Sequence, residues 1–462
     1  MFLGREKELH KLNQYYQSSK FEMLMVYGRR RVGKTKLLTE FIKDKDAIYY
    51  VAEENNDFRN MAKFTKIITN HFNENLNINF SEWEDIFKYI SKNLGNKKLV
   101  LVIDELPYIA LSNLSFLSIL QNSIDHDLLN KNIMIILCGS SISFMENEIV
   151  SHKSPLYGRK TGQLKIEPFD YFDSAKFFPD YSIKDKIKTY SVLGGIPHYL
   201  IKFDNKFSLQ SNITKNILDS SSFLYDEPNN LLHQELRSPV IYNAIIEAIA
   251  SGSSKINEIS TKIHETPTKT NKYIKSLLEL QILKKIHPIN KENSKKTIYL
   301  INDNLYKFIY KYVYSNRSLI EQDFGEIVYN KKIEPNWNNY LGKIFEDICL
   351  EYLLRKNAKL ELEFLVEKFG TWWGNNPIKK RQEEIDIVGL SENKGIYCEC
   401  KYSNEKLGIA VYNKLVERSD LINKNEKYYY LFSKSGFTPE LKELEKIKEN
   451  LKLVTLEELF NI

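Results

Sequence analysis

The sequence predicts an α/β multidomain protein whose first domain contains a parallel sheet. Length supports several domains, because 462 residues are more than one hydrophobic core of ordinary size organises. Uninterrupted apolar runs such as MLMVY, KLVLVID and NIMIILCG support the parallel sheet, since strands that are buried on both faces read this way. A content of 42% hydrophobic and 13% aromatic residues is typical of globular domains.

The lack of long apolar segments and the spacing of the cysteines predict a protein of the cytoplasm. No stretch approaches the ~20 apolar residues that a membrane helix needs, so no membrane partner is expected. The opening residues MFLGREKEL lack the apolar segment of a secretory signal, which favours a soluble cytoplasmic protein. The cysteines suit neither a disulfide framework nor a zinc knuckle, and we expect reduced thiols in the core. They are Cys138, Cys349, Cys398 and Cys400.

The strongest chemical signal is the segment GRRRVGKTK, which contains the pattern G-x-x-x-x-G-K-T between an apolar strand and an amphipathic helix. The backbone N–H groups of such a P-loop cradle phosphate oxygens. Lys34 would reach the β and γ phosphates, and Thr35 would ligate Mg²⁺. A chance glycine turn is the alternative, and the flanking strand and helix count against it. The predicted ATP-binding segment is Gly28, Arg29, Arg30, Arg31, Val32, Gly33, Lys34, Thr35 and Lys36.

Two later apolar strands end in polar residues that the P-loop chemistry can use. Parallel strands point their carboxyl ends at one edge, so Asp104 can hold Mg²⁺ together with Thr35, while Glu105 polarises the attacking water. The next strand delivers Ser140 or Ser141 to the same edge, where a hydroxyl could sense the γ-phosphate. An ordinary loop serine is the alternative for this last position.

From about residue 238 the pattern changes to short helices followed by a lysine-rich hairpin, which predicts a winged helix-turn-helix. Residues 251–300 contain 10 lysines against 4 glutamates, a basic surplus that nucleic acid would attract. The exposed face of the third helix and the wing would supply the phosphate contacts to DNA. The alternative is a structural module that packs on the ATPase. The lysines in question are Lys269, Lys272 and Lys275 on the helix, and Lys291, Lys295 and Lys296 on the wing.

The last third of the chain combines a helix carrying Glu346 with two short strands, EIDIV and GIYCECK. Period-two alternation places Glu399 and Lys401 on one face of the second strand, and Asp386 with Val388 on one face of the first. If the charged faces meet, Glu346, Asp386 and Glu399 provide hard oxygen ligands for Mg²⁺ or Mn²⁺, with Lys401 beside them. A hairpin with solvated charges is the alternative.

Several of these segments resemble the archaeal-type ATPase family, a branch of the AAA+/STAND class of P-loop NTPases. The similar segments are FLGREKEL, GRRRVGKT, VIDELPYIA, SPLYGRKTGQLKIEPF and GGIPHYL. The resemblance implies that Arg5 borders the nucleotide pocket and that Arg159 is a candidate arginine finger, acting in its own subunit or in a neighbour. It also implies that Gly195 and Pro197 mark a helical lid that reports nucleotide state.

The carboxyl-terminal strands resemble the PD-(D/E)xK nuclease family, in which an Asp is followed after about a dozen residues by Glu-x-Lys. The resemblance implies that Lys401 orients or deprotonates the nucleophile at the metal site. The region also looks like the domain of unknown function that commonly follows this ATPase type. The predicted domains are a P-loop NTPase core (1–165), a helical lid (166–235), a winged helix (236–325) and a PD-(D/E)xK nuclease-like domain (326–462).

The function predicted from these parts is ATP binding and hydrolysis, coupled to DNA binding and to DNA cleavage at the nuclease-like domain. The alternative is a STAND-type regulatory switch, in which ATP drives assembly into a homo-oligomer and the later modules bind DNA or protein without catalysis.

Overall fold

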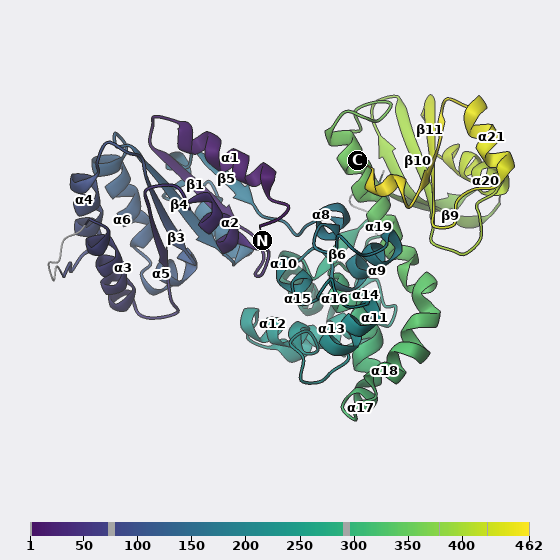
Figure 1. Ribbon diagram of the computed structural model, residues 1–462, viewed down its shortest axis with the longest axis horizontal. Helices are drawn as coiled ribbons and strands as arrows, with labels where there is room; N and C mark the ends of the chain where they lie inside the picture. The colour runs from purple at the N-terminus through teal and green to yellow at the C-terminus, as the bar shows by residue number, and fades with distance from the viewer. Residues whose placement is uncertain (1, 73–78, 290–295, 378, 423, 462) are drawn as a thin grey trace. The chain divides into compact units, whose positions relative to one another are not determined.

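The computed structural model describes residues 2–72, 79–289, 296–377, 379–422 and 424–461. The chain divides into two compact units (Figure 1). The first consists of Met1–Pro168 with Ile196–His198, and the second of Phe169–Gly195 with Tyr199–Ile462. Among the described residues, no helix combines the length and the apolar character needed to cross a membrane.

The first unit contains a parallel sheet. Its strands are β1 (Glu22–Tyr27), β2 (Ala47–Val51), β3 (Leu99–Asp104), β4 (Ile133–Gly139) and β5 (Gly162–Lys165). Their order across the described part of the sheet is β2-β3-β4-β1-β5, and each neighbouring pair is parallel. Every residue of β1, β3 and β4 is buried, which confirms the sequence prediction of strands covered on both faces.

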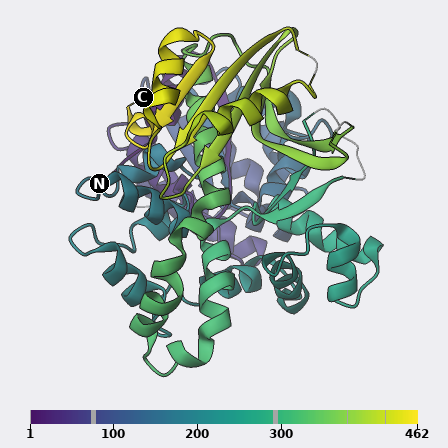
Figure 2. The same cartoon turned by 90° about the vertical axis from the view of Figure 1, so that its right-hand side faces the viewer.

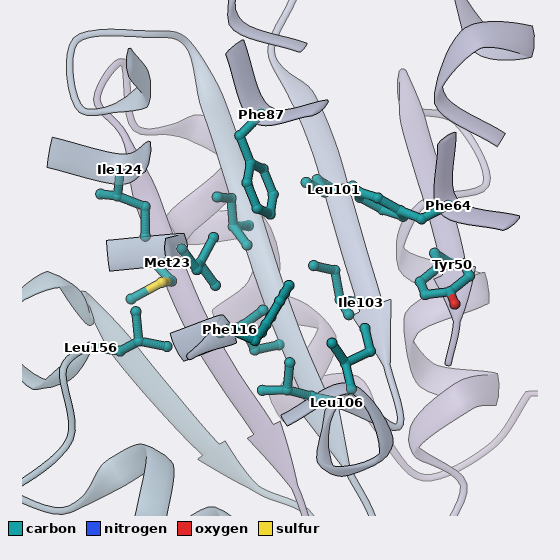
Figure 3. Packing of buried hydrophobic residues seen from close by; sticks show 14 of the residues in the cluster. Met23, Tyr50, Phe64, Phe87, Leu101, Ile103, Leu106, Phe116, Ile124 and Leu156 are labelled. Carbon is teal, nitrogen blue, oxygen red and sulfur yellow. The ribbon is translucent and has the colours of Figure 1, made fainter. Parts of the chain in front are cut away.

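Helices cover the two faces of this sheet. They are α1 (Glu6–Gln17), α2 (Lys34–Phe41), α3 (Asp57–His71), α4 (Trp83–Asn93), α5 (Leu106–Ser112), α6 (Phe116–Ser123) and α7 (Ile142–Phe144). Alternate residues of β1 serve different cores. Met23 belongs to the cluster that contains aromatic residues of α3, α4 and α6, such as Phe64 and Phe116 (Figure 3), whereas Leu24 belongs to the cluster that contains Leu37 of α2. This alternation is the period-two pattern of a strand between two helical layers.

The second unit begins with helices and a small antiparallel hairpin. Its first elements are α8 (Tyr171–Ala175), α9 (Ile183–Leu193), α11 (Leu209–Asn216), α12 (Glu227–Glu235), α13 (Pro239–Ala250), α14 (Ile256–Lys262), α15 (Pro267–Glu279), β6 (Leu283–Ile286), β7 (Ile298–Ile301) and α16 (Asn304–Phe308). The short helix α10 (Pro197–Leu200) begins in the first unit and ends in the second. Helix α15 begins at a favourable N-terminal cap, because the Thr266 hydroxyl accepts from the Lys269 N–H and Pro267 occupies the first turn. Helices α13, α14 and α15 share one apolar core with the hairpin.

The rest of the second unit is built on a mixed sheet, green to yellow in Figures 1 and 2. The elements are α17 (Arg317–Ile320), α18 (Gly325–Val328), α19 (Trp337–Ala358), β8 (Lys368–Asn376), β9 (Arg381–Leu390), β10 (Lys394–Lys401), α20 (Ile409–Ser419), β11 (Glu426–Ser433), α21 (Pro439–Ile447) and β12 (Leu451–Thr455). The order is β12-β11-β10-β9-β8 in the described residues. Strands β10, β11 and β12 are parallel, and β8 and β9 complete the sheet as antiparallel strands.

Strand β9 contains an irregularity that changes which way its carboxylates face. Its pairing with β8 shifts register between Gly370 and Trp372. As a result Ile385 and Val388, three positions apart, both pack in the core under α20. The prediction that Asp386 and Val388 share a face was therefore wrong. Strict alternation fails at a bulge, because one extra residue inverts the phase of everything on one side of it.

Helix α19 is bonded to the helices that begin the second unit. The Glu351 carboxylate accepts from the Tyr190 hydroxyl at 2.7 Å and from the Tyr171 N–H at 2.9 Å. Burial, followed by the charge of Asp170, raises the pKa of Glu351 to about 8. Arg355 pairs with Asp170 on the same side of α19. All four cysteines lie in the described part of the chain, and each is buried with a free thiol, as predicted.

Candidate functional site

The P-loop runs from the end of β1 to the start of α2, and its backbone requires glycine at two points. A Cβ on Gly28 would lie 2.2 Å from the Ile166 carbonyl oxygen, so any side chain there displaces the loop or β5. Gly33, the residue before α2, has φ of 91°, a left-handed conformation that glycine adopts without strain. Pro197 lies beside this turn, with its Cγ 3.7 Å from the position of a Gly33 Cβ.

Lys34 is folded into the loop. Its ammonium donates to the carbonyl oxygens of Gly28 and Arg29 at 2.8 and 3.0 Å, and the residue is 6% exposed. Burial lowers the pKa of Lys34, while Glu105 and Asp104 are among the groups that oppose this shift. A buried ammonium at the mouth of a loop of backbone N–H groups is suited to an anionic ligand.

The end of β3 places two hard oxygen atoms side by side. Thr35 Oγ1 donates to Asp104 Oδ2 at 3.0 Å, and the Tyr49 hydroxyl of β2 donates to the same oxygen at 2.6 Å. Asp104 is 2% exposed. A hydroxyl and a carboxylate in this arrangement fit Mg²⁺, which prefers oxygen ligands and is held this way in P-loop proteins. Tyr49 was missed by sequence reasoning, although its register opposite Val102 puts it on the face of Asp104.

Glu105 and Ser140 form one hydrogen-bonded pair across β3 and β4. Glu105 Oε2 accepts from the Ser140 hydroxyl at 2.8 Å and from its backbone N–H at 3.3 Å. Glu105 has φ of 52°, an uncommon left-handed conformation for a side chain with a Cβ. The serine that sequence reasoning offered as a phosphate sensor thus positions the neighbouring carboxylate.

The arginines around the loop have separate tasks. Arg5 donates to the carbonyl oxygens of Val32 at 3.0 Å and Glu167 at 2.7 Å, and it is 5% exposed. It therefore clamps the loop to the segment after β5. Arg29 is buried, while Arg30 donates to the Tyr108 hydroxyl at 3.2 Å. Arg31 has φ of 71°, and Lys36 is exposed on α2.

Arg159 lies away from the P-loop of its own chain. It precedes β5, which is parallel to β1, so it lies at the amino edge of the sheet, whereas the loop follows the carboxyl edge. Its guanidinium makes two bonds to the Asp125 carboxylate, at 2.9 and 2.6 Å. This position gives Arg159 no access to phosphates in its own loop.

A second cluster, which we call the carboxylate cluster, consists of Glu346 on α19 and Glu384 and Asp386 on β9. One oxygen from each lies within 4.8 Å of the others among the described residues, a spacing that could hold a metal ion. Sequence reasoning named Glu346 and Asp386 but missed Glu384, although Glu384 and Asp386 are two positions apart on one strand face. Burial and then Asp386 raise the pKa of Glu346, and burial and then Glu399 raise that of Asp386.

Glu399, the third predicted ligand, is held by cations outside this cluster. Its Oε1 lies 2.6 Å from the Lys401 ammonium, and its Oε2 accepts from Arg418 of α20 at 3.1 Å. Arg418 also bonds Glu383 at 2.9 Å. The Lys401 ammonium lies 4.0 Å from Asp386, so it connects Glu399 to the carboxylate cluster. The structure thus brings Glu346 and Asp386 together with Lys401 beside Asp386, and it keeps Glu399 at the periphery.

Lys343 bridges two members of the carboxylate cluster. Its ammonium lies 2.9 Å from Glu346 and 2.9 Å from Glu384. Gly342, the preceding residue, has no heavy atom within 4 Å of the position of a Cβ, so the space beside the cluster is open there. The local charge is therefore balanced by a partly exposed side chain that contacts both carboxylates.

A cavity of about 310 Å³ adjoins the cluster inside the second unit. Glu346 and Asp386 form part of its lining, together with residues of α13, the hairpin, α16 and β8. Lys284 of β6 and Lys307 of α16 contact the Asp347 carboxylate of α19 at 2.5 and 3.5 Å on this lining. The hairpin is thus anchored to α19 beside the carboxylates.

The predicted DNA-contacting lysines fall into two groups. Lys269, Lys272 and Lys275 are exposed on α15, opposite buried residues such as Ile274. Of the wing lysines, Lys291 and Lys295 lie outside the described residues, and Lys296 is described and half-buried. The hairpin packs within its own unit, since the Ile289 N–H donates to the Thr371 carbonyl oxygen of β8 at 3.0 Å.

Comparison with known proteins gives the most specific description of the first unit. Residues 2–203 match an ATPase domain found predominantly in Archaea, and residues 309–414 match a domain of archaeal and bacterial proteins of unknown function. An uncharacterized protein of Methanocaldococcus jannaschii is 34% identical over 441 residues, which cover 94% of this chain and 96% of that protein. An uncharacterized ATP-binding protein of the same organism is 42% identical over 45 residues, 10% of this chain and 76% of the other.

Among solved structures, a Walker-type ATPase of Pyrococcus abyssi is similar. It has 21% sequence identity and a TM-score of 0.51, with 67% of this chain and 96% of that chain covered. This likeness concerns the fold.

Proposed function

The chain belongs to the same family as the uncharacterized Methanocaldococcus jannaschii protein, and its residues 2–203 match the archaeal ATPase domain. We propose that it hydrolyses ATP, and from its later elements we propose in addition that it acts on DNA. The observation that carries the first part is the meeting of the P-loop with Thr35 and Asp104 at one sheet edge. Thr35 and Asp104 would hold Mg²⁺, which would neutralise charge on the phosphates. Lys34 would exchange its carbonyl partners for phosphate oxygens, and Glu105 would orient the attacking water.

The second part of the proposal concerns the end of the chain. We assign the carboxylate cluster, with Lys401, to a PD-(D/E)xK-like site that cleaves phosphodiesters of DNA. The support is that Glu346, Asp386 and Lys401 come from separate elements yet approach one another as a nuclease requires. A divalent cation there would supply charge for the phosphate, and Lys401 would orient or deprotonate the nucleophilic water.

The third part concerns the grip on DNA. Helices α13 to α15 and the following hairpin have the element order of a winged helix, and α15 exposes lysines that could contact the phosphates in a groove. Binding that depends on these lysines must weaken linearly with the logarithm of salt concentration. Lys269→Ala with Lys272→Ala should lower the affinity and reduce the salt slope by about 2.

The experiment for the ATPase compares wild type with Lys34→Ala and with Lys43→Ala as a matched control. Lys43 follows α2 and is well exposed, so its loss should leave hydrolysis unchanged. Loss of hydrolysis in Lys34→Ala alone supports the proposal, and equal activity in all three proteins refutes it.

The experiment for cleavage incubates linear, branched and single-stranded DNA with ATP and Mg²⁺ or Mn²⁺. Lys401→Ala is compared with Lys394→Ala, a lysine on the same strand that pairs with Glu426 away from the cluster. Cutting that disappears only in Lys401→Ala supports the nuclease assignment. DNA left intact by wild type favours the alternative function, a STAND-type switch whose later modules bind without catalysis.

We further propose that Arg159 acts as an arginine finger between copies of the chain, since it has no access to the loop of its own chain. An arginine finger at the amino edge of the sheet can serve only the nucleotide of a second copy, so an ATP-dependent homo-oligomer is part of the proposal. Mass measurement with and without ATP tests it, and a monomer under both conditions removes Arg159 from catalysis.

A further inference from the structure

The cavity beside the carboxylate cluster has the features of a ligand site that the cluster by itself does not explain. Its volume of about 310 Å³ lies at the small end of the range for ligand pockets. Apolar side chains form one part of the lining, among them Ile286 and Leu300 of the hairpin and Ile344 of α19. The size and the apolar lining suit one aromatic base rather than a base pair.

Charge on the lining favours an anion. Four lysines line the cavity against three carboxylates, and two of those carboxylates belong to the proposed metal site. A divalent cation bound there would leave the cavity strongly positive. The lysines are Lys284, Lys307, Lys311 and Lys343.

Lys311 differs from the other three lysines. Its ammonium lies over the rings of Tyr340 and Tyr312, 5.5 and 5.6 Å from their centroids. In the described part of the chain no carboxylate lies within ion-pairing distance of it, and burial lowers its pKa. Lys311 is therefore a partly desolvated cation with an unused capacity to bind an anion.

The walls of the cavity are fixed to each other. Lys284 joins the hairpin to Asp347 of α19, and the Ile289 N–H joins the hairpin to β8. A Cβ on Gly370 of β8 would already lie 3.2 Å from the Ile289 side chain, so the two surfaces are in close contact. A cavity with walls held in this way is preformed, which reduces the cost of ordering on binding.

We propose that this cavity binds the phosphorylated terminal nucleotide of a nucleic-acid strand, with its base among Ile286, Leu300 and Ile344 and its terminal phosphate at Lys311. The inference rests on the proposed nuclease function and specifies its substrate as strand ends. Hydrolysis would add the water oxygen to phosphorus, break the ester bond to the next sugar, pass the water proton to that sugar oxygen and release one nucleotide.

The test separates binding from cleavage. Fluorescence anisotropy measures the binding of labelled eight-residue oligothymidylates to the full chain, with Ca²⁺ present and strand length checked on a gel. The strands carry a 5′-phosphate, a 3′-phosphate or no terminal phosphate, and a circular strand of the same composition has no end. We expect either the 5′-phosphorylated or the 3′-phosphorylated strand to bind about fivefold or more tightly than the circle. Which of the two strands does so shows which end the cavity binds.

Two variants and one control locate the preference. Lys311→Ala removes the cation from the cavity, and Leu300→Trp fills the cavity, so each should abolish the preference for the phosphorylated end. Lys332→Ala, an exposed lysine elsewhere in the same unit, should keep it. Because part of the Lys311 side chain is exposed and it forms no ion pair within the described residues, Lys311→Ala should retain the fold.

Two results would overturn the inference. One is equal affinity for phosphorylated ends, unphosphorylated ends and circles, and the other is an end preference that survives both cavity variants. Cleavage of circles as fast as linear strands in Mn²⁺ would also overturn it while leaving the proposed nuclease intact. Failure to cut any strand removes the nuclease function, and the binding comparison still decides whether the cavity takes a strand end.

Discussion

The choice between Glu384 and Glu399 as the third ligand gives the sharpest test of the carboxylate cluster. The substitutions are Glu384→Gln and Glu399→Gln, each of which removes one charge and keeps the side-chain shape. Alternation along the strands predicts Glu399, whereas the structure groups Glu384 with Glu346 and Asp386. Ligand charge count is a main determinant of affinity for a hard cation.

The structure sets the expected magnitudes. Three oxygens within 4.8 Å of one another surround a point about 2.8 Å from each, which must contract only slightly to reach the ~2.3–2.6 Å of calcium-like coordination. Glu384→Gln should therefore weaken Mn²⁺ binding by about tenfold or more, ~1.4 kcal/mol. Both oxygens of Glu399 already face cations, so Glu399→Gln should change affinity by less than about threefold.

Electron paramagnetic resonance of free Mn²⁺, recorded without nucleotide, measures these affinities. Glu392→Gln, in the exposed turn between β9 and β10, is the matched control and should leave the affinity unchanged. Thermal unfolding of each variant checks that the fold is retained. If Glu399→Gln weakens Mn²⁺ binding tenfold while Glu384→Gln behaves as the control, the proposed cluster is incorrect. Glu399, the ligand predicted from strand alternation, would then be the third ligand.

Three further predictions follow from packing and burial. Gly28→Ala should abolish ATP binding in a filter assay while the chain stays folded by circular dichroism, because its Cβ would meet the Ile166 carbonyl at 2.2 Å. Arg418→Met should destabilise the second unit by about 2–4 kcal/mol in urea unfolding, because two buried carboxylates each lose a cation. Glu351 has a pKa of about 8 in the folded protein, above its ordinary value, so the stability of the wild type should fall between pH 5 and pH 8. The side chain in Glu351→Gln can still accept from Tyr190 but does not ionise. In thermal scans, the stability of this variant relative to wild type should therefore rise by about 1 kcal/mol or more from pH 5 to pH 8.

The phosphate site was largely predictable because its signal is local. The glycines, Lys34 and Thr35 are adjacent in sequence, and the parallel sheet brings Asp104 and Ser140 to the same edge. What sequence reasoning missed depends on pairing between distant segments. Tyr49 reaches Asp104 only because β2 lies beside β3. Arg5 was named through the family resemblance alone, and its contacts with Val32 and Glu167 could not be read from the sequence.

The carboxylate cluster was predictable only in part, for a different reason. Period-two alternation assumes an unbroken strand, and the register shift between β8 and β9 reverses the phase at Asp386. That shift belongs to the contact with β8, which no pattern in residues 384–401 reveals. The attachment of Glu399 to Arg418 likewise depends on how α20 crosses the sheet.

Helix α19 connects the carboxylate cluster to helix α9 at the start of the second unit. It carries Glu346 and, five residues later, Glu351, which accepts from the Tyr190 hydroxyl of α9. Tyr340 on the same helix donates to the Ser191 carbonyl oxygen of α9. Helix α9 in turn leads through Gly195, where a Cβ would overlap the Phe169 backbone, into the short segment Ile196–His198 that belongs to the P-loop unit. A rearrangement of α9 must therefore either carry α19 and Glu346 with it or break buried hydrogen bonds that cost about 1–3 kcal/mol each when left unpaired. Because moving α9 and α19 together avoids that cost, the carboxylates on α19 are expected to follow α9 as one rigid body.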